Sequence, residues 1–283
     1  MIGAYPIIHC GFLEITIRTS IGTNSHTTNS IDIMKIIQIT DTHLFSDPLG
    51  KLHGYCSHQL LSDIITHLTS IYHRDGKPDF YFLTGDISQD ESIESYKLAL
   101  NQLERLDAPV YWIQGNHDDR NRIKSIFNSS NNLTQLKKLV TPAWDYIAID
   151  TCQPSKDEGY ISKEEMQFFL SAVEKSKQSH KNIAIVMHHH ACPVGTPLID
   201  ECILRDSYDF IRTIKSIDEI KLVICGHVHG DYRIPIGKKF IETCPATCFQ
   251  WKKGTQNIET ENKRGFKVFE FNSNTYESTT MLI

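Results

Sequence analysis

KIIQIT, residues 35–40, is a short apolar run, and the polar residues Asp41 and His43 follow it directly. We predict this run as the first strand of the fold. Helix-period segments alternate with further apolar runs of this kind along the rest of the chain. That alternation is expected when helices cover both faces of sheets built largely from buried strands. The sequence therefore predicts a layered α/β fold.

The later elements follow the same alternation. Further strands are predicted at DFYFLTG (79–85), PVYWIQG (109–115), DYIAID (145–150), NIAIVM (182–187) and KLVICG (221–226). Helices are predicted at 57–74 and 92–106, with two more starting near Ser162 and Ser207. Past His229 the pattern becomes that of hairpin-like strands, at 234–242, 265–271 and 275–283. No internal repeat or linker interrupts this body, so residues 34–283 are predicted to form one domain.

Residues 1–33 differ from that body. Their polar tract TSIGTNSHTTNS carries no periodicity, and a secretory signal would need a basic start and an unbroken apolar centre. Met34 stands directly before the first predicted strand and is an alternative start of the protein. The leader is therefore expected to be either a disordered tail or a segment upstream of the natural start.

Composition excludes several classes of protein. Lys and Arg total 29 against 34 Asp and Glu, a formal charge of -5, so a nucleic-acid backbone is not expected as a general partner. No apolar run approaches the roughly 20 residues of a membrane span, so we expect a soluble, cytoplasmic protein. The eight cysteines are scattered and are expected to be reduced. Cys244 and Cys248 are interpreted as thiols of a packed loop, with metal binding or oxidation as the alternative. A homodimer is left open.

Metal-type side chains follow five of the predicted strands. Because open α/β sheets place their sites at the carboxyl ends of strands, these side chains are candidates for one site. The groups are Asp41 and His43, Gly85 and Asp86, Gly115 to Asp118 (GNHD), His188 to His190, and Gly226, His227 and His229 of GHVH. Alone, each has a simpler explanation: an aspartate that caps a turn, a common Gly-Asp turn, or a tag-like surface run of histidines. Their combination in this order disfavours those explanations.

The order D-x-H, G-D, G-N-H-D, H, G-H-x-H resembles the calcineurin-like metallophosphoesterase superfamily, over nearly all of the chain from Lys35 onward. The resemblance implies a four-layer α-β-β-α sandwich with mixed sheets and two metal ions that share one carboxylate. It assigns Asp41, His43, Asp86 and His229 to the first ion. It assigns Asp86, Asn116, His188 and His227 to the second. Mixed imidazole and carboxylate ligands suit divalent iron or manganese, with zinc as an alternative.

The resemblance also gives His117 a catalytic role, in which it contacts a phosphate oxygen or protonates the leaving alkoxide. Asp118 is expected either to fix the tautomer of His117 or to cap the helix that begins in DRNRIKSIF. Within the histidine run, the family pattern favours His188 as the ligand over His189 and His190.

Flanking segments, among them TDTHLFSDPLGKLHGYCSHQLL and PATCFQWKKGT, resemble the class III cyclic nucleotide phosphodiesterases of bacteria. That resemblance implies hydrolysis of 3′,5′-cyclic AMP to 5′-AMP by a hydroxide that bridges the two metals. The residues expected around the nucleotide phosphate are His43, Asp86, Asn116, His117 and His229. Phe249 and Trp251 either stack on the base or pack a loop. Ala191 stands where the family commonly has proline, which affects a loop and no ligand.

Two alternatives remain at this point. The same site could serve a broad-specificity metallophosphoesterase acting on other phosphodiesters, nucleotides or phosphomonoesters. A non-catalytic metal-binding scaffold is disfavoured, because every ligand position is filled and His117 is present.

Overall fold

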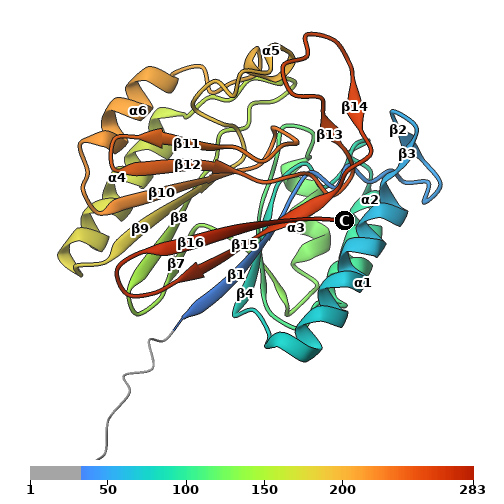
Figure 1. Ribbon diagram of the computed structural model, residues 1–283, viewed down its shortest axis with the longest axis horizontal. Helices are drawn as coiled ribbons and strands as arrows, with labels where there is room; N and C mark the ends of the chain where they lie inside the picture. Colours follow the sequence, from blue (N-terminus) through green and yellow to red (C-terminus); the bar gives the residue numbers. More distant parts are fainter. Residues whose placement is uncertain (1–32) are drawn as a thin grey trace, which may run out of the picture. The chain divides into compact units, whose positions relative to one another are not determined.

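The computed structural model describes residues 33–283, except for the side chains of residues 72–75. Its strands form two six-stranded sheets (Figure 1). The first has the order β16 (Tyr276–Leu282), β15 (Gly265–Phe271), β1 (Met34–Ile39), β4 (Phe80–Thr84), β5 (Val110–Ile113) and β6 (Leu133–Gln135). The second has the order β11 (Arg233–Ile236), β12 (Lys239–Thr243), β10 (Ile220–Cys225), β9 (Asn182–Met187), β8 (Trp144–Ile149) and β7 (Lys138–Val140).

The remaining elements are helices and two small hairpins. The helices are α1 (Ser57–Asp75), α2 (Ile93–Leu103), α3 (Arg120–Phe127), α4 (Lys163–Gln178), α5 (Pro197–Asp200) and α6 (Ser207–Lys215). The hairpins pair β2 (Lys51–Leu52) with β3 (Tyr55–Cys56), and β13 (Gln250–Trp251) with β14 (Thr260–Glu261).

Both sheets contain parallel and antiparallel neighbours. In the first, β1, β4, β5 and β6 run parallel, and β15 pairs antiparallel with both β1 and β16. In the second, β12, β10, β9 and β8 run parallel, with β11 and β7 antiparallel at the two edges. Parallel neighbours end at the same edge of a sheet, so each sheet gathers its carboxyl ends along one edge.

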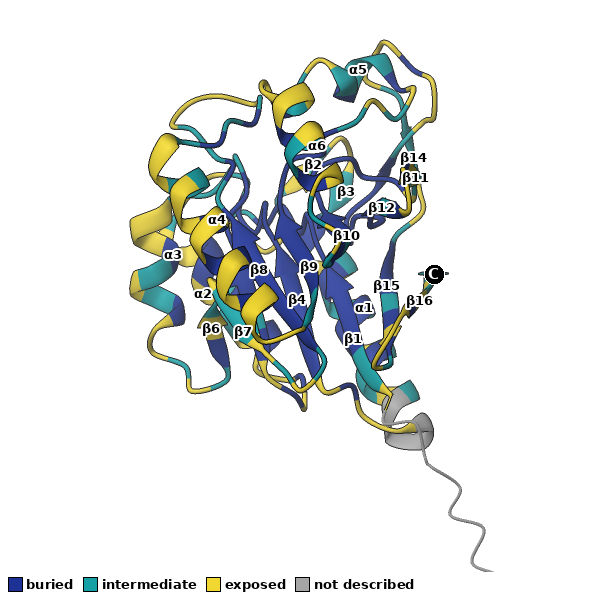
Figure 2. Ribbon diagram, turned by 90° about the vertical axis from the view of Figure 1, so that its left-hand side faces the viewer, coloured by how far each residue is buried: buried dark blue, intermediate teal, exposed yellow. Residues whose placement is uncertain are grey.

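Most buried apolar side chains form three large cores, because successive residues of a strand face opposite sides of a sheet, and a small fourth cluster holds Ala246, Cys248 and Phe249. Ile36, Phe82 and Tyr146 belong to the core between the sheets, whereas the neighbouring Ile37 faces the core under α1, α2 and α3. A third core, which includes Phe169, lies under α4 and α6. Figure 2 shows the outcome, with buried strands at the centre and exposed helix faces outside. The predicted four-layer α-β-β-α sandwich is therefore confirmed.

Most predicted elements are present, and the differences have local causes. The strand predicted at 234–242 is a hairpin, because Gly237 takes a left-handed turn (φ 74°) between β11 and β12. The three-residue strands β6 and β7 were not predicted, since so short a run shows no periodicity. The predictions for the leader, residues 1–33, lie outside the described residues except at Ile33.

Two further expectations concern membrane crossing and cysteine chemistry. None of the helices found within residues 33–283 combines the length and apolar character that crossing a bilayer requires. The seven cysteines of the described part are free, and Cys244 and Cys248 are buried thiols, as predicted.

One buried ionic network links the two sheets beside the carboxyl edge. Lys267 of β15 places its Nζ 2.8 Å from Asp231 Oδ1 and 3.2 Å from Glu242 Oε2 of β12. Glu242 is fully buried and also accepts hydrogen bonds from Tyr276 Oη at 2.8 Å and Ser278 Oγ at 2.6 Å. Because Asp231 closely follows the GHVH segment, Lys267 helps to hold that segment in place.

We expect Lys267→Met to lower the free energy of unfolding by about 1–3 kcal/mol, because the buried Glu242 loses its buried cation and keeps only the half-exposed Arg233, whose Nε lies 3.2 Å from Glu242 Oε1. Urea unfolding with an unchanged m value measures this loss. The control is Lys252→Met, which breaks an exposed ion pair with Glu259 and should leave the free energy of unfolding almost unchanged, because water and salt screen such a pair. Equal effects of the two substitutions would contradict the role given to the network.

Candidate metal centre

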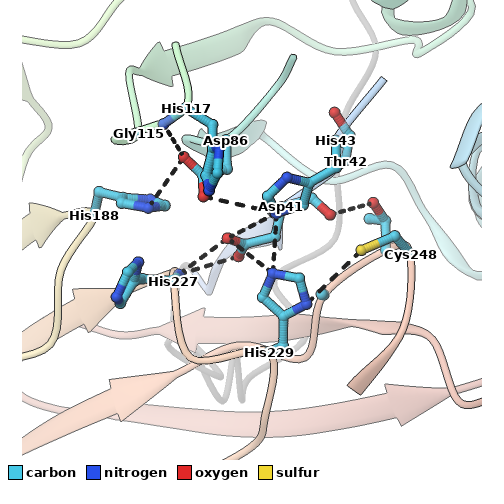
Figure 3. A network of polar contacts seen from close by, with 12 residues as sticks. Asp41, Thr42, His43, Asp86, Gly115, His117, His188, His227, His229 and Cys248 are labelled. Carbon is cyan, nitrogen blue, oxygen red and sulfur yellow. Dashed lines mark hydrogen bonds and ion pairs between the residues drawn. The ribbon is translucent and has the colours of Figure 1, made fainter. Parts of the chain in front are cut away.

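The predicted site residues converge at the carboxyl edge of the two sheets (Figure 3). They follow β1, β4 and β5 of one sheet and β9 and β10 of the other: Asp41 and His43, Asp86, Asn116 and His117, His188, and His227 and His229. Backbone hydrogen bonds continue between the loops after the strands end. The amide of His43 donates to Asp86 O at 2.9 Å, and that of Gly226 donates to His188 O at 3.0 Å. The cluster is thus built on extensions of the sheets.

The backbone at this edge is strained. Five of the clustered residues lie in the left-handed region without being glycine, which is uncommon. Their φ values are 53° for Asp41, 45° for His43, 50° for Asp86, 69° for His227 and 45° for His229. Such conformations persist only where the surroundings impose them, and they concentrate at functional sites.

Two glycines make room for the side chains. Gly85 has φ 99°, which favours glycine, and a Cβ there would lie 2.5 Å from His188 Nδ1. A Cβ on Gly115 would lie 2.1 Å from Asp86 Oδ1, inside any allowed contact. The absence of a side chain at Gly85 and Gly115 therefore leaves the space in which Asp86 and His188 approach each other.

Asp86 faces two groups of ligand atoms at once. Its Oδ2 lies 3.6 Å from His43 Nε2, and its Oδ1 lies 3.3 Å from His188 Nε2. The two carboxylate oxygens therefore point to opposite sides, which is the arrangement needed for one carboxylate to serve two ions.

On the first side, two imidazoles face each other through unprotonated nitrogens. His43 Nδ1 lies 2.7 Å from Gln89 Oε1, and His229 Nδ1 lies 3.1 Å from Phe249 O, so both Nδ1 atoms donate. Burial lowers the pKa of His43 to about 4 and lowers the pKa of His229 well below its ordinary value, so both rings are neutral. Their Nε2 lone pairs then meet at 3.0 Å, an approach that a cation bound by both nitrogens would stabilise. Asp41 Oδ1, 3.6 Å from His229 Nε2, completes this group.

On the second side, oxygen atoms converge on histidine nitrogens. His188 Nδ1 faces Thr84 O at 2.8 Å, which leaves its Nε2 directed at Asn116 Oδ1 at 3.1 Å. His227 Nδ1 lies 3.1 Å from the same Asn116 oxygen, and burial lowers the pKa of His227 well below its ordinary value. Asp86, His188 and His227 form a cluster with metal-ligand spacing.

The side chains present therefore fit a pair of divalent ions. The donor set combines imidazole nitrogens, carboxylates and one amide oxygen, which suits iron, manganese or zinc better than calcium or magnesium. Ring nitrogens directed at backbone carbonyls fix the tautomers that such ligation needs.

Neighbouring predicted residues have other partners. Asp119 caps α3 by accepting from the amides of Asn121 and Arg122, so the expectation that Asp118 caps this helix was wrong by one residue. Asp118 accepts from the amides of Gly115 at 2.9 Å and Ser88 at 3.0 Å and makes no hydrogen bond with His117 among the described residues.

The other two histidines of the run pack their rings against that of His227, at centroid distances of 4.7 Å for His189 and 5.7 Å for His190, but hydrogen-bond elsewhere. His189 bonds through Nδ1 to Thr151 Oγ1 at 2.7 Å and through Nε2 to Asp157 O at 3.1 Å. His190 Nε2 lies 3.4 Å from Asp200 Oδ1. Of the three rings, only that of His188 is directed at Asp86 and Asn116.

Sequence reasoning missed Gln89 and His53, which stand in loops with no ligand pattern around them. Gln89 bonds His43, as described above. Both residues line a cleft of about 170 Å³ beside the candidate ligands, together with His117, Asp157, Phe249 and Trp251. The His53 ring lies 5.4 Å from that of Phe249 and 5.5 Å from that of Trp251, which gives the cleft an aromatic wall.

The sandwich and its paired ligand groups define a metal-dependent hydrolase of the α-β-β-α class. Residues 34–231 match the calcineurin-like phosphoesterase family, and the chain belongs to this family.

Named relatives agree with this membership. The chain is 32% identical to a probable cyclic nucleotide phosphodiesterase of Coxiella burnetii over 83% of this chain and 92% of that protein. It is 29% identical to a 3′,5′-cyclic adenosine monophosphate phosphodiesterase of Vibrio vulnificus over 81% of each. A dimetal phosphatase from Danio rerio shares the fold, with a TM-score of 0.62 at 12% identity, over 87% of this chain and 98% of that one.

Metal removal should destabilise the folded protein, because the facing lone pairs and the Asp86 carboxylate lose the charge between them. We expect manganese or zinc at about a hundredfold excess over its dissociation constant to raise the melting temperature of chelator-treated protein by about 5 °C or more. Differential scanning fluorimetry measures the shift. His188→Ala should reduce it, and calcium should not reproduce it. An unchanged melting temperature would sink the metal assignment.

Proposed function

We propose that this chain hydrolyses 3′,5′-cyclic AMP to 5′-AMP at the candidate metal centre. The observation that carries the proposal is Asp86, whose two oxygens face separate histidine groups beside an open cleft. The named activities of the Coxiella and Vibrio relatives support a cyclic nucleotide as the substrate.

The ligand sets follow from the two sides of Asp86. Asp41, His43, Asp86 and His229 would hold one ion. Asp86, Asn116, His188 and His227 would hold the other. When bound, two such ions supply an activated water and positive charge for the phosphate oxygens. The two ions are expected to be iron, manganese or one of each, with zinc as the alternative.

The charge of the donor set favours an anionic substrate. Asp41 and Asp86 are the only carboxylates among the seven proposed ligands, because Asn116 contributes a neutral oxygen. Two divalent ions would therefore keep a surplus of positive charge. That surplus attracts a phosphodiester and holds its phosphate against the ligand cluster.

His117 is the proposed catalytic residue. Its backbone amide donates to Asp86 Oδ1 at 3.0 Å, and its ring lies edge-on to that of His43 with centroids 5.2 Å apart. The half-buried ring lines the cleft, where it can donate a hydrogen bond to a phosphate or leaving-group oxygen. His43, Asp86, Asn116 and His229 line the same cleft and would surround the phosphate.

The aromatic wall supports a nucleoside on one side of the phosphate. Phe249 is fully buried and packs beneath the wall, whereas Trp251 is partly exposed and His53 is exposed. A base entering the cleft would therefore contact Trp251 and His53, and Phe249 would support them from behind.

A second cavity favours the broader alternative. It measures about 450 Å³, shares Asn116 with the first cleft, and is lined by polar side chains such as Arg120, Asn121 and Gln153. A phosphodiester with two large arms could use both cavities, so activity on other diesters is the runner-up function.

Manganese-loaded protein should hydrolyse cyclic AMP and bis-p-nitrophenyl phosphate faster than the monoester p-nitrophenyl phosphate. Asn116→Ala and His117→Ala should each lower turnover by about a hundredfold, the scale of a lost metal-tuning group or acid-base residue. Product release measured by chromatography gives the rates. Dominant monoesterase activity would defeat the diesterase proposal, and unchanged rates in both variants would place the reaction elsewhere.

Trp251→Ala should raise the KM for cyclic AMP by about tenfold, because loss of a stacking face costs roughly 1–3 kcal/mol per base. The KM for bis-p-nitrophenyl phosphate should change less, since this substrate has no base. Steady-state kinetics on both substrates gives the comparison. An equal rise for the two would show a structural effect in place of base recognition.

A further inference from the structure

Asp118 joins the loop that follows β4 to the loop that follows β5. Its Oδ1 accepts hydrogen bonds from the backbone amides of Ile87 at 3.1 Å and Ser88 at 3.0 Å. Its Oδ2 accepts from the amide of Gly115 at 2.9 Å and lies 3.2 Å from the amide nitrogen of Ile87. Because a backbone N–H only donates, the carboxylate is the acceptor in each of these contacts. One side chain therefore holds backbone groups of both loops.

Each loop carries a proposed ligand next to an amide that Asp118 holds. Asp86 directly precedes the first of these amides in its loop, and Asn116 directly follows Gly115. The turn from Gly115 to Asp118 also closes on itself, since the amide of Asp118 donates to Gly115 O at 3.3 Å. Asn116 and His117 are thus presented between the two ends of a closed turn.

A buried phenol orients the carboxylate. Tyr96 of α2 is fully buried, and its hydroxyl donates to Asp118 Oδ1 at 3.2 Å. The same hydroxyl oxygen accepts from the amide of Asp119 at 2.8 Å, so its own proton is left for Asp118. The direction of the Asp118 side chain is therefore set from a helix that carries no proposed ligand.

We infer that Asp118 is a positioning residue that fixes the distance between Asp86 and Asn116 and so assembles the ligands of the second ion. The inference rests on the proposed function only in taking these two residues as metal ligands. His117 N donates to Asp86 Oδ1 at 3.0 Å, a contact between the loops that needs the same register (Figure 3). Since Asn116 is proposed to bind the second ion alone, a loosened link should weaken that ion more than the first.

Asp118→Asn would separate the two loops in a defined way. An asparagine side chain has one acceptor oxygen and one NH2 group, which only donates. The oxygen should face the three donors on the Oδ1 side, which are the amides of Ile87 and Ser88 and the Tyr96 hydroxyl. The NH2 group then faces the Gly115 amide, so the bond to the loop after β5 is lost. Because Asp118 borders the second cavity, water can solvate the new group, and we expect the variant to fold.

Manganese titration of chelator-treated protein, followed by calorimetry, tests the inference. The wild type should bind two ions. We expect Asp118→Asn to weaken the binding of one ion by about tenfold or more, the scale for a lost group that orients a ligand, and that of the other by less than about threefold. Electron paramagnetic resonance should show the coupled manganese pair forming at correspondingly higher concentration. Unchanged binding of both ions, or an equal loss for both, would overturn the inference.

A double-mutant cycle identifies the ion concerned. Asn116→Ala removes a proposed ligand of the second ion and should weaken the same ion as Asp118→Asn. Added to Asn116→Ala, the Asp118→Asn substitution should cause less than about threefold further loss, because Asp118 acts through Asn116. Losses that multiply would show that Asp118 acts through another group and would contradict the assigned role.

Asp119→Asn is the matched control for charge. It removes the same charge one residue away, while an asparagine oxygen can still accept from the amides of Asn121 and Arg122 at the start of α3. The affinities for both ions should stay within about threefold of the wild-type values. A loss as large as that of Asp118→Asn would mean that nearby negative charge, and not the link between the loops, holds the ion.

A measurement on the unaltered chain decides the matter if a variant fails to fold. In metal-free wild-type protein, the Gly115 and Ser88 amides should exchange with solvent at least about a hundredfold more slowly than in an unstructured peptide, because Asp118 holds them without an ion. Hydrogen exchange followed by NMR gives the rates, and rapid exchange at Gly115 would refute the link. A wild type that binds fewer than two ions would sink the proposed centre and this inference with it. Two bound ions without hydrolysis of cyclic AMP would sink only the proposed substrate.

Discussion

The site depends on buried ligand atoms whose mutual repulsion the protein chain relieves only in part, through the contact of His188 with Asp86. Lone pairs of His43 and His229 meet at 3.0 Å, and Asp86 directs its two oxygens at opposite histidine groups. Buried acceptors that face one another in this way are costly unless positive charge lies between them. The carbonyl and carboxamide oxygens that take up the Nδ1 protons enforce the arrangement. The cluster thus keeps lone pairs and carboxylate charge that a bound cation would satisfy.

The fold creates this repulsion through the direction of its strands. Each sheet keeps four parallel strands, so polar residues that are distant in sequence arrive at one edge. Packing of the two sheets through the Ile36, Phe82 and Tyr146 core brings those edges together. Lys267 and Glu242 connect the sheets close to the GHVH segment. Burial and ligand placement therefore come from the same layered architecture.

Sequence reasoning predicted the layers and the candidate ligands because both are local patterns. Apolar runs such as NIAIVM and the polar residues after them are visible in any one segment, and β9 has the predicted bounds. The cap of α3 was misplaced by one residue, because Asp118 and Asp119 look alike in the sequence and differ only in where their side chains point in the structure. Gln89 and His53 could not be found, because their roles come from contacts across loops. Spacing along the chain carries no record of those contacts.

The five left-handed backbones at the ligand positions have a consequence for how such a chain changes over generations. Each non-glycine residue held there costs of order 1–3 kcal/mol, so glycine or asparagine in place of a ligand would relieve strain while ending ion binding. Selection for folding stability alone would therefore replace the ligand residues before the residues of the surrounding layers. Proteins of this architecture that have lost their ligands and their activity should accordingly have a higher free energy of unfolding than those that keep them.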